Sequence, residues 1–557
     1  MGRLIEVFCE NTGSRKKYEL GTSLCEVIKD QNISLSYPVL GAMVNNRLKE
    51  LSYEIFKPKT IRFFDITSLA GQRMYLRSLC FVLYKAASEI FPNNRLKIEH
   101  MISGGLYCEI EGLTMNSDNG QSPVDKIRNR MGEIIQYDYP IVRQEVLTTE
   151  AIKIFESNNL TEKAKLLQTR GLLYTSVYHL DNMVDYFYGC LVPSTAYLKS
   201  FALVNYFDGM LLLTPKKSNP SKLQEVFIQN KLFEIFREHK EWAEILNVPD
   251  IASLNQAVLD GNIGEIIKIA EALQEKKLAQ IADKIFNSRN EAKIILIAGP
   301  SSSGKTTFAK RISVQLRVLG LKPIQISLDN YFVEREKTPK DNSGQYNFDS
   351  FKALDAELFN HDIQELLKGR AVKLPKFSFT NGNRHYFNEK LKIDKENILI
   401  VEGIHGLNPA LIPAIDSRLK FKVYVSALTQ LGIDSHNRIP TTDNRLIRRI
   451  VRDHRYRGYS ALETLQRWSS VRKGEDRNIF PFQEEADIMF NTALLFELGV
   501  LKQYAEPLLS RVMENSPEYD EAKRLLKFLS YFLPIPDREI PPTSILREFL
   551  GGSSFGY

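Results

Sequence analysis

The segment GPSSSGKT at residues 299–306 constrains the fold more than any other feature of the sequence, because it fits the pattern GxxxxGK(S/T) in full. An apolar run at residues 294–298 precedes it, and a helical pattern at residues 307–312 follows it. The glycines let the backbone turn so that successive N–H groups face an anion, and the start of the helix adds partial positive charge. This order predicts a P-loop for a nucleoside triphosphate rather than a chance Gly/Ser-rich turn.

The residues of this loop have expected roles in holding the nucleotide. Lys305 is expected to reach the β- and γ-phosphates, and the hydroxyl of Thr306 is expected to hold Mg²⁺. The residues predicted to bind the nucleotide are Gly299, Ser301, Ser302, Ser303, Gly304, Lys305, Thr306 and Thr307.

Length and composition limit the class of protein. The chain has 557 residues, which suggests about three to four domains. With 43% hydrophobic and 25% charged residues it is not disordered, collagen-like or coiled-coil, and the net charge of 74 − 67 = +7 allows an anionic ligand without requiring nucleic acid. No apolar run approaches the roughly 18 residues of a membrane span. No signal-peptide core is visible, and five cysteines without a CxxC pair favour a reducing cytoplasm.

Hydrophobic periodicity divides the chain into segments of different texture. Alternating apolar runs and helical patterns from about residue 293 predict a mainly parallel sheet covered by helices. Before it, short strands surround one helix, a mixed α+β region follows, and an almost wholly helical stretch leads into the sheet. The predicted domains are residues 1–67, 68–215, the helical linker 216–288, the P-loop domain 289–495 and the helical extension 496–557.

Two carboxylates stand where apolar runs of the predicted sheet end. Asp329 follows the run at residues 323–328, and Glu402 follows the run at residues 398–401. Open α/β sheets bind ligands at the carboxyl ends of their strands. Asp329 is therefore predicted to orient a substrate hydroxyl and accept its proton, with a turn residue as the alternative. Glu402 is predicted to hold Mg²⁺ together with Thr306 and Asp329.

Arginines gather in residues 445–457 at helical spacings, so that one helix face carries several guanidinium groups. Such groups can stabilise the charge on a transferring phosphoryl group, and a closing lid excludes water. A solvated face or an RNA patch is the alternative.

Five ordered blocks resemble the uridine kinase/phosphoribulokinase family of P-loop kinases over about residues 294–491. They are residues 299–307, DNYF at 329–332, YNFD at 346–349, VEGI at 401–404 and RRIVRD at 448–453. The resemblance implies an α/β kinase domain in which Asp329 is the catalytic base beside Lys305, and Asp349 holds the ribose 2′- and 3′-hydroxyls. It also implies a lid that clamps the triphosphate through Arg449, Arg452 and Arg457.

The base-binding block departs from that family. Phe377 and Ser378 stand where uridine kinases carry Tyr and Asp, and no His follows at the family's position. A site without those polar groups discriminates bases poorly or differently, so a nucleoside is implied but not uridine. The residues predicted to contact the substrate are Asp349, Phe377, Arg384 and Tyr331.

The N-terminal part resembles threonyl-tRNA synthetases, with a small β-grasp-like TGS domain at 1–67 and an α+β editing-type domain after it. Tyr75 and Leu79 replace the expected HxxxH pair, Ser194 replaces a His, and Cys190 alone remains of the metal-type set. A single thiolate cannot build a zinc site, so no metal and no editing hydrolysis are expected, and Cys190 is expected to lie in the core. A relic scaffold, a regulatory module and a contact surface for RNA all stay open.

The leading hypothesis is therefore a Mg²⁺-dependent nucleoside 5′-kinase that uses ATP or GTP. Two alternatives remain: an RNA-binding regulatory protein whose P-loop senses nucleotide, and a kinase of another small alcohol. Oligomerisation through the helical linker or the C-terminal helices also stays open.

Overall fold

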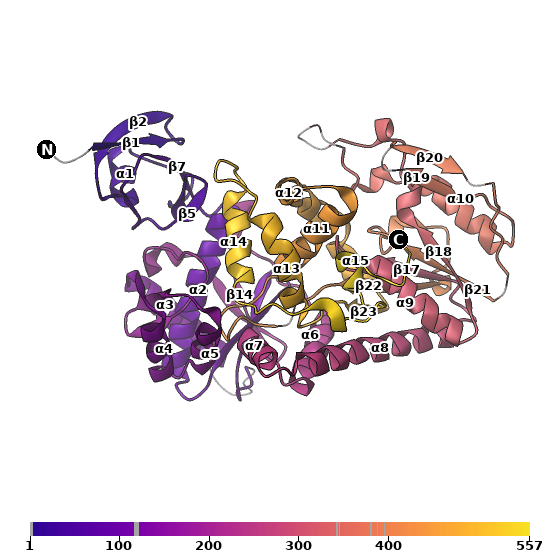
Figure 1. Ribbon diagram of the computed structural model, residues 1–557, viewed down its shortest axis with the longest axis horizontal. Helices are drawn as coiled ribbons and strands as arrows, with labels where there is room; N and C mark the ends of the chain where they lie inside the picture. Colours follow the sequence, from indigo (N-terminus) through magenta and orange to yellow (C-terminus); the bar gives the residue numbers. More distant parts are fainter. Residues whose placement is uncertain are drawn as a thin grey trace.

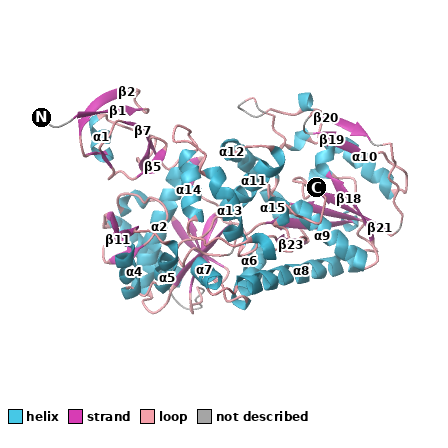
Figure 2. Cartoon of the chain, in the orientation of Figure 1, coloured by secondary structure: helices cyan, strands magenta, loops and turns pink. Residues whose placement is uncertain are grey.

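The computed structural model describes residues 4–115, 122–340, 344, 346–378, 381–386, 388–394, 396–429 and 431–556. Figure 1 shows an elongated molecule with the N-terminal elements at one end, the elements after residue 294 at the other, and the C-terminal helices between them. Strands and helices are mixed in both halves (Figure 2). Across these described ranges, no helix is long and apolar enough to cross a membrane.

The first segment is a five-stranded sheet of order β2-β1-β7-β4-β5 beside one helix, as the periodicity predicts. Buried and exposed residues alternate along β1, and β1 pairs antiparallel with β2 but parallel with β7. A capping box between Ser23 and Glu26 starts the helix. The elements are β1 (Leu4–Cys9), β2 (Ser14–Glu19), β3 (Thr22–Ser23), α1 (Leu24–Asp30), β4 (Gly41–Val44), β5 (Arg47–Lys49), β6 (Glu54–Ile55) and β7 (Lys59–Phe64).

The second segment is mixed α+β, with sheets of order β13-β14-β9-β8 and β10-β11-β12. Helix α2 begins after its N-cap Ser68 and buries Met74, Leu79 and Phe81 in the core of this segment. The elements are α2 (Leu69–Ile90), β8 (Leu96–Ile102), β9 (Gly105–Ile110), α3 (Pro123–Gln136), β10 (Ile141–Leu147), α4 (Thr148–Ser157), α5 (Thr161–Arg170), β11 (Tyr174–Leu180), β12 (Met183–Asp185), β13 (Ala202–Tyr206) and β14 (Gly209–Leu213).

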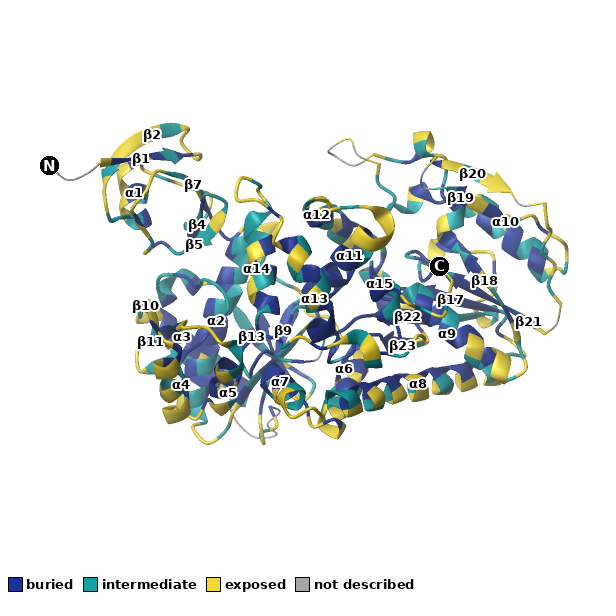
Figure 3. Cartoon of the chain, viewed as in Figure 1, coloured by how far each residue is buried: buried dark blue, intermediate teal, exposed yellow. Residues whose placement is uncertain are grey.

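The helical linker begins later than predicted. The sequence predicts helices across the linker at residues 216–288, but β15 (Pro215–Lys216) pairs with β16 (Asn219–Leu223), and an irregular stretch that includes Phe227 follows. The Ser103 hydroxyl donates to the Phe227 carbonyl and accepts the Phe227 N–H, so tertiary contacts override the helical spacing of this stretch. The helices are α6 (Asn230–Ile245), α7 (Ile251–Leu259) and α8 (Ile263–Asn287), and exposed and buried residues alternate along α8 in Figure 3.

The third segment confirms the predicted parallel sheet, whose strand order is β18-β21-β17-β22-β23. Its strands are β17 (Ile294–Ala298), β18 (Lys322–Ser327), β21 (Asn397–Glu402), β22 (Lys420–Ser426) and β23 (Ile488–Asn491). A separate hairpin joins β19 (Pro375–Ser378) to β20 (Asn383–Tyr386). The helices are α9 (Lys305–Val318), α10 (Ala356–Leu367), α11 (Thr441–Arg457) and α12 (Ala461–Asn478).

The C-terminal helices connect the two halves. They are α13 (Glu497–Leu509), α14 (Tyr519–Leu529) and the short α15 (Arg547–Leu550). On α14, Glu521 pairs with Arg73 at 2.6 Å, and Asp520 accepts a hydrogen bond from the Leu48 N–H at 2.8 Å. The chain then returns to the parallel-sheet domain, where Figure 1 places the C-terminus near α9.

Candidate nucleotide and phosphoryl-transfer site

The predicted phosphate cradle lies between β17 and α9. A Cβ on Gly299 would lie 1.8 Å from the carbonyl oxygen of Val425, so only glycine fits there. Gly304 has φ +83°, and a Cβ on it would lie 2.8 Å from Cγ2 of Ile545. Both glycines of the motif are therefore required by the packing around them and, at Gly304, by the backbone angle.

Lys305 and Thr306 begin α9, directly after the turn. The Lys305 ammonium donates to the Pro300 carbonyl at 3.1 Å, so it already leans over the loop. Burial lowers the pKa of Lys305, while the carboxylates of Glu402 and Asp329 oppose this shift. A phosphate group would supply the negative charge that a desolvated ammonium favours.

The two predicted carboxylates meet beside this cradle. Glu402 is the last residue of β21 and lies in register with Ser327 of β18, whose hydroxyl donates to it at 2.9 Å. Burial and the nearby Asp329 raise the pKa of Glu402 to about 7. Desolvation by its surroundings raises the pKa of Asp329, and the charge of Lys305 opposes this rise. The structure thus brings Lys305, Asp329 and Glu402 together.

Asp349 belongs to the same charged group. Burial raises its pKa to about 6, Arg449 opposes the rise, and Asp329 contributes to it. Helix α12 presses against this residue at Gly474, where a Cβ would lie 2.6 Å from that of Asp349. Asn478 of the same helix donates to the Asp349 carbonyl at 2.8 Å, which fixes the backbone there.

The predicted arginines lie on one side of α11. Arg449 donates to the Ser301 hydroxyl at 2.7 Å and therefore touches the cradle itself. Arg449, Arg452 and Arg457 share the single carboxylate of Asp453, at 3.1, 2.8 and 3.6 Å. Burial and the neighbouring Arg452 lower the pKa of Arg457 to about 10. Three guanidinium groups facing one carboxylate leave this surface positively charged.

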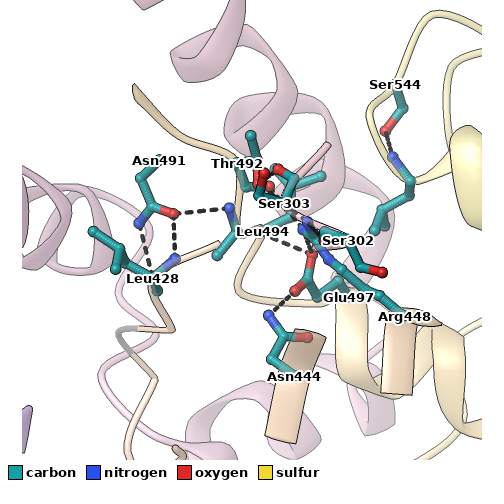
Figure 4. Close-up of polar contacts among 12 residues, drawn as sticks. Ser302, Ser303, Leu428, Asn444, Arg448, Asn491, Thr492, Leu494, Glu497 and Ser544 are labelled. Carbon is teal, nitrogen blue, oxygen red and sulfur yellow. Dashed lines mark hydrogen bonds and ion pairs between the residues drawn. The ribbon is translucent and has the colours of Figure 1, made fainter. Parts of the chain in front are cut away.

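A buried network braces the cradle from beneath, and Figure 4 shows its members converging from separate elements. Arg448 is fully buried and donates to the carboxylate of Glu497 at 2.5 Å and to the carbonyl of Thr492 at 2.9 Å. The Thr492 hydroxyl donates to the Ser303 carbonyl at 2.6 Å. Asn444 donates to the other oxygen of Glu497. The network fixes the carbonyl groups of Ser303 and Thr492, and so holds the end of the loop in place.

A second buried pair joins Arg445 to Glu475 and holds the loop at Ser301. Glu475 accepts the Ser301 N–H at 2.9 Å, and Arg445 donates to the Ser301 carbonyl at 3.1 Å. Sequence reasoning missed Glu475 and Glu497. Each stands in an ordinary helical pattern, and no local signal marks it as a partner of the loop.

The predicted substrate contacts other than Asp349 make contacts within the protein. Tyr331 is fully buried and donates its hydroxyl to Asp362 at 3.1 Å, which corrects its predicted contact with substrate. Phe377 lies in an aromatic cluster with Phe332 and Phe348. Residues 379 and 380, which follow it in the base-binding block, lie outside the described residues.

Arg384 is held by the protein itself. Its guanidinium donates to Asp355 at 2.9 Å and to the Phe332 carbonyl at 3.0 Å. These bonds tie β20 to the loop that follows β18. A direct role of Arg384 or Phe377 in substrate binding stays a prediction.

The motif positions of the N-terminal half are occupied by protein contacts. The Tyr75 hydroxyl donates to the Ser200 carbonyl at 2.9 Å, and Leu79 is fully buried. Cys190 is half-buried and packs against the core of this segment, and burial raises the pKa of its thiol to about 11. Arg77 donates to the Cys190 carbonyl at 2.8 Å.

The parallel sheet with its glycine-bent cradle defines the second half of the chain as a P-loop kinase-like α/β domain. Residues 294–494 match the model of the Phosphoribulokinase / Uridine kinase family, and this part of the chain is a domain of that family. The uridine kinase of Ligilactobacillus salivarius is 29% identical over 204 residues, which cover 36% of this chain and 86% of that protein.

The N-terminal half is similar to a different group of proteins. Threonine–tRNA ligase of Syntrophomonas wolfei is 26% identical over 195 residues, 35% of this chain. The chain spans 30% of the length of that ligase. Both resemblances drawn from the sequence are confirmed. A solved structure described as a possible uridine kinase from Bacillus stearothermophilus has a TM-score of 0.24 and 20% identity, covering 36% of this chain and 89% of that one.

Proposed function

We propose that this chain transfers the γ-phosphate of ATP or GTP to the 5′-hydroxyl of a ribonucleoside. The observation that carries the proposal is the meeting of Lys305, Asp329 and Glu402 at one edge of the parallel sheet, where Asp329 and Glu402 act on the pKa of Lys305, and Asp329 and Lys305 act on the pKa of Glu402. The match of residues 294–494 to a kinase family supports it. So do the hydroxyls of Ser302 and Ser303, which are buried without a hydrogen-bond partner among the described residues and for which a bound phosphate offers acceptors.

In this proposal Asp329 is the catalytic base. As the 5′-oxygen bonds to the γ-phosphorus, the bond from that phosphorus to the bridging oxygen breaks, the nucleoside diphosphate leaves, and Asp329 accepts the hydroxyl proton. The raised pKa of Asp329, caused by burial, makes its carboxylate a better proton acceptor. Lys305 and the arginines Arg449, Arg452 and Arg457 stabilise the negative charge on the transferring group.

Mg²⁺ fits the same edge of the sheet. Asp329 raises the pKa of Glu402, a repulsion that a divalent cation between the two carboxylates would relieve. Thr306, Asp329 and Glu402 would hold the ion, whose charge would neutralise oxygens of the β- and γ-phosphates. The protein's own part is to hold these oxygen ligands beside Lys305.

The nucleoside is proposed to bind through Asp349, whose carboxylate can accept hydrogen bonds from two vicinal ribose hydroxyls. Phe377 offers an aromatic face to a base, but the polar groups of the uridine kinase block are replaced here. We therefore propose a nucleoside kinase that is of the uridine/cytidine type by family and that discriminates between bases either poorly or differently from that family.

A substrate panel tests this proposal directly. The protein is incubated with Mg²⁺, with ATP or GTP, and with each common ribonucleoside, deoxyribonucleoside and small sugar alcohol. Formation of a nucleoside 5′-monophosphate is the expected result. Phosphorylation of a sugar phosphate or another small alcohol alone would instead support the alternative kinase, and no product from any acceptor would contradict both.

We further propose that residues 1–67 are a TGS-like domain, 68–215 a degenerate editing-like domain, 216–288 a helical linker, 289–495 the kinase domain and 496–557 a helical extension. The N-terminal half supports a second candidate function, contact with RNA. Positive side chains gather there around Cys190, and among the described residues no carboxylate forms an ion pair with any of them. They are Lys49, Arg77, Arg143, Arg170 and Lys527.

Lys527 illustrates the charge of this cluster. Burial lowers its pKa to about 8, and the nearby cations Arg170 and Arg143 add to the effect. If the cluster binds RNA, affinity for tRNA should fall linearly with the logarithm of salt concentration, and Arg143→Ala with Lys527→Ala should reduce the slope. The matched control is Lys284→Ala, an exposed lysine on α8. No binding of tRNA at low salt would contradict this function.

A further inference from the structure

The C-terminal segment, residues 544–556, crosses the phosphate cradle. It starts with a turn in which Ser544 accepts the Leu546 N–H at 3.2 Å. Ile545 then packs against Gly304, and the ring of Phe549 lies 5.0 Å from the guanidinium carbon of Arg448. Farther on, the Gly556 carbonyl accepts a hydrogen bond from Lys310 of α9 at 2.6 Å. The segment is thus held at several points along the loop and the helix that follows it.

One charged side chain of this segment reaches the cradle itself. The carboxylate of Glu548 accepts the Thr307 hydroxyl at 2.6 Å and the Thr307 N–H at 3.3 Å. Thr307 is the third residue of α9, so its N–H is one of the donors at the helix start that have no partner within the helix. In a P-loop these donors face the phosphates of the nucleotide.

Glu548 also adds negative charge where the phosphates would bind. Burial and Asp329 raise the pKa of Glu402 most, and Glu548 contributes to the same rise. Burial lowers the pKa of Lys305, and Glu548 is among the carboxylates that oppose the shift. A carboxylate and a phosphate oxygen cannot share the donors of one residue without strong repulsion, because neither carries a proton to place between them at neutral pH.

We propose that residues 544–556 form a strap over the cradle, in which Glu548 competes with a phosphate group of the nucleotide for the hydroxyl and N–H of Thr307. The inference rests on the proposed function, because it concerns the same nucleotide site. Binding of nucleotide displaces Glu548. The factor by which bound nucleotide weakens the contact between Glu548 and Thr307 equals the factor by which that contact weakens nucleotide binding. The strap therefore sets the affinity of the chain for its phosphate donor.

A simpler role for Glu548 makes the opposite prediction. A carboxylate near a helix start stabilises the helix through its dipole and its free N–H groups. If that were its whole role, Glu548→Gln would lower the thermal stability of the protein and leave nucleotide affinity unchanged or weaker. The strap requires that the same substitution tighten binding.

The test measures binding of MgATP and MgGTP to the full chain by calorimetry. Glu548→Gln keeps the shape of the side chain and removes its charge, and we expect it to lower the dissociation constant about fivefold to a hundredfold, the usual range for coupled sites. Glu539→Gln is the matched control, because Glu539 lies in the same C-terminal region but faces Lys268 at 3.8 Å. An unchanged or raised dissociation constant in Glu548→Gln would overturn the strap.

Hydrogen exchange provides a second measurement that does not depend on a substitution. When MgATP binds the wild-type protein, amides of residues 545–552 should exchange faster, because the strap is released. Slower exchange there would mean that the segment closes over the nucleotide, and would overturn the proposal. Binding by wild-type protein without any change in these amides would reject the strap and leave the kinase function standing. Failure of both wild type and Glu548→Gln to bind any nucleotide would reject both.

Discussion

Two groups of arginines on the same helix, α11, are neutralised in different ways. Arg445 and Arg448, the bracing group, are fully buried and pair with the buried carboxylates of Glu475 and Glu497 respectively. Arg449, Arg452 and Arg457, the open group, share the carboxylate of Asp453. The bracing group holds carbonyl groups of the phosphate loop, whereas the open group leaves positive charge beside the cradle.

The difference separates charges that hold the protein together from charges that await a ligand. A buried ion pair is neutral as a unit, and breaking it leaves one unpaired charge in a medium that solvates it poorly. An excess of unneutralised charge at a cleft costs stability by repulsion and is relieved when an anion binds. Substitutions in the bracing group should therefore change the free energy of unfolding, whereas substitutions in the open group should change catalysis.

The largest expected effect is that of a substitution at Asp329, near which Arg452 and Arg457 of the open group lie. Asp329→Asn removes the proposed proton acceptor, and we expect kcat for nucleoside phosphorylation to fall about 10²- to 10⁴-fold. Affinity for ATP measured without Mg²⁺ should change little, because the loop and its bracing arginines are untouched. Asp416→Asn, at an exposed carboxylate paired with Arg418, is the control and should behave as wild type. A kcat for Asp329→Asn close to the wild-type value would remove the base from the mechanism.

A substitution in the bracing group is expected to lower the stability of the folded protein. Arg448→Met leaves Glu497 buried without its partner, so the free energy of unfolding should drop by about 3–5 kcal/mol. Chemical denaturation measures this. The double variant Arg448→Met with Glu497→Gln should recover part of the loss, since no buried charge is left unpaired. A single variant as stable as wild type would mean that the pair does not brace the loop.

The matching substitution in the open group is Arg452→Ala. Here we expect kcat/KM to fall about a hundredfold, the effect of losing one charged donor to the transferring phosphoryl group. The free energy of unfolding should change by less than about 1 kcal/mol, because Asp453 keeps two other arginines. If the stability of Arg452→Ala falls as far as that of Arg448→Met while kcat/KM is unchanged, the distinction between the bracing group and the open group is wrong.

The smallest expected effect is a pH dependence from Glu402. Burial and Asp329 raise its pKa from the ordinary 4.5 to about 7, so the folded protein binds a proton that the unfolded chain has lost in this range. Its contribution to stability is complete below pH 4.5 and disappears as pH rises through about 7.

Thermal midpoints from about pH 4 to pH 8 measure this contribution. The decline with rising pH should be smaller in Glu402→Gln than in wild type. Added Mg²⁺ should stabilise wild type more at the upper end of the range, because the ion binds the ionised carboxylate. Equal pH profiles for wild type and Glu402→Gln would contradict the raised pKa.

The sequence predicted the parallel sheet and the cradle because both follow from local patterns. Apolar runs alternate with helical spacing after residue 293, and the loop needs glycine at two positions within eight residues. The carboxylates Asp329 and Glu402 were also accessible to prediction, since each directly follows an apolar run whose end faces the site. Their meeting follows from the rule that parallel strands present their carboxyl ends on one edge.

Long-range partners were not accessible to prediction. Glu475 accepts a hydrogen bond from Ser301, which lies 174 residues away, and Glu548 reaches Thr307 across 241 residues. Each stands in a helical pattern where a glutamate usually faces water. Tyr331 failed as a predicted substrate contact for a related reason: its motif position does not reveal that the side chain turns into the core.

By itself, then, the sequence determined where an anion can be held. That property depends on backbone angles and clearances around Gly299 and Gly304, which a short motif contains completely. Only the tertiary structure decided which charges around the anion are neutralised, which remain open, and that the end of the chain lies across the cradle. The energy of a charge depends on every group within about 10 Å, and most of those groups come from distant parts of the chain.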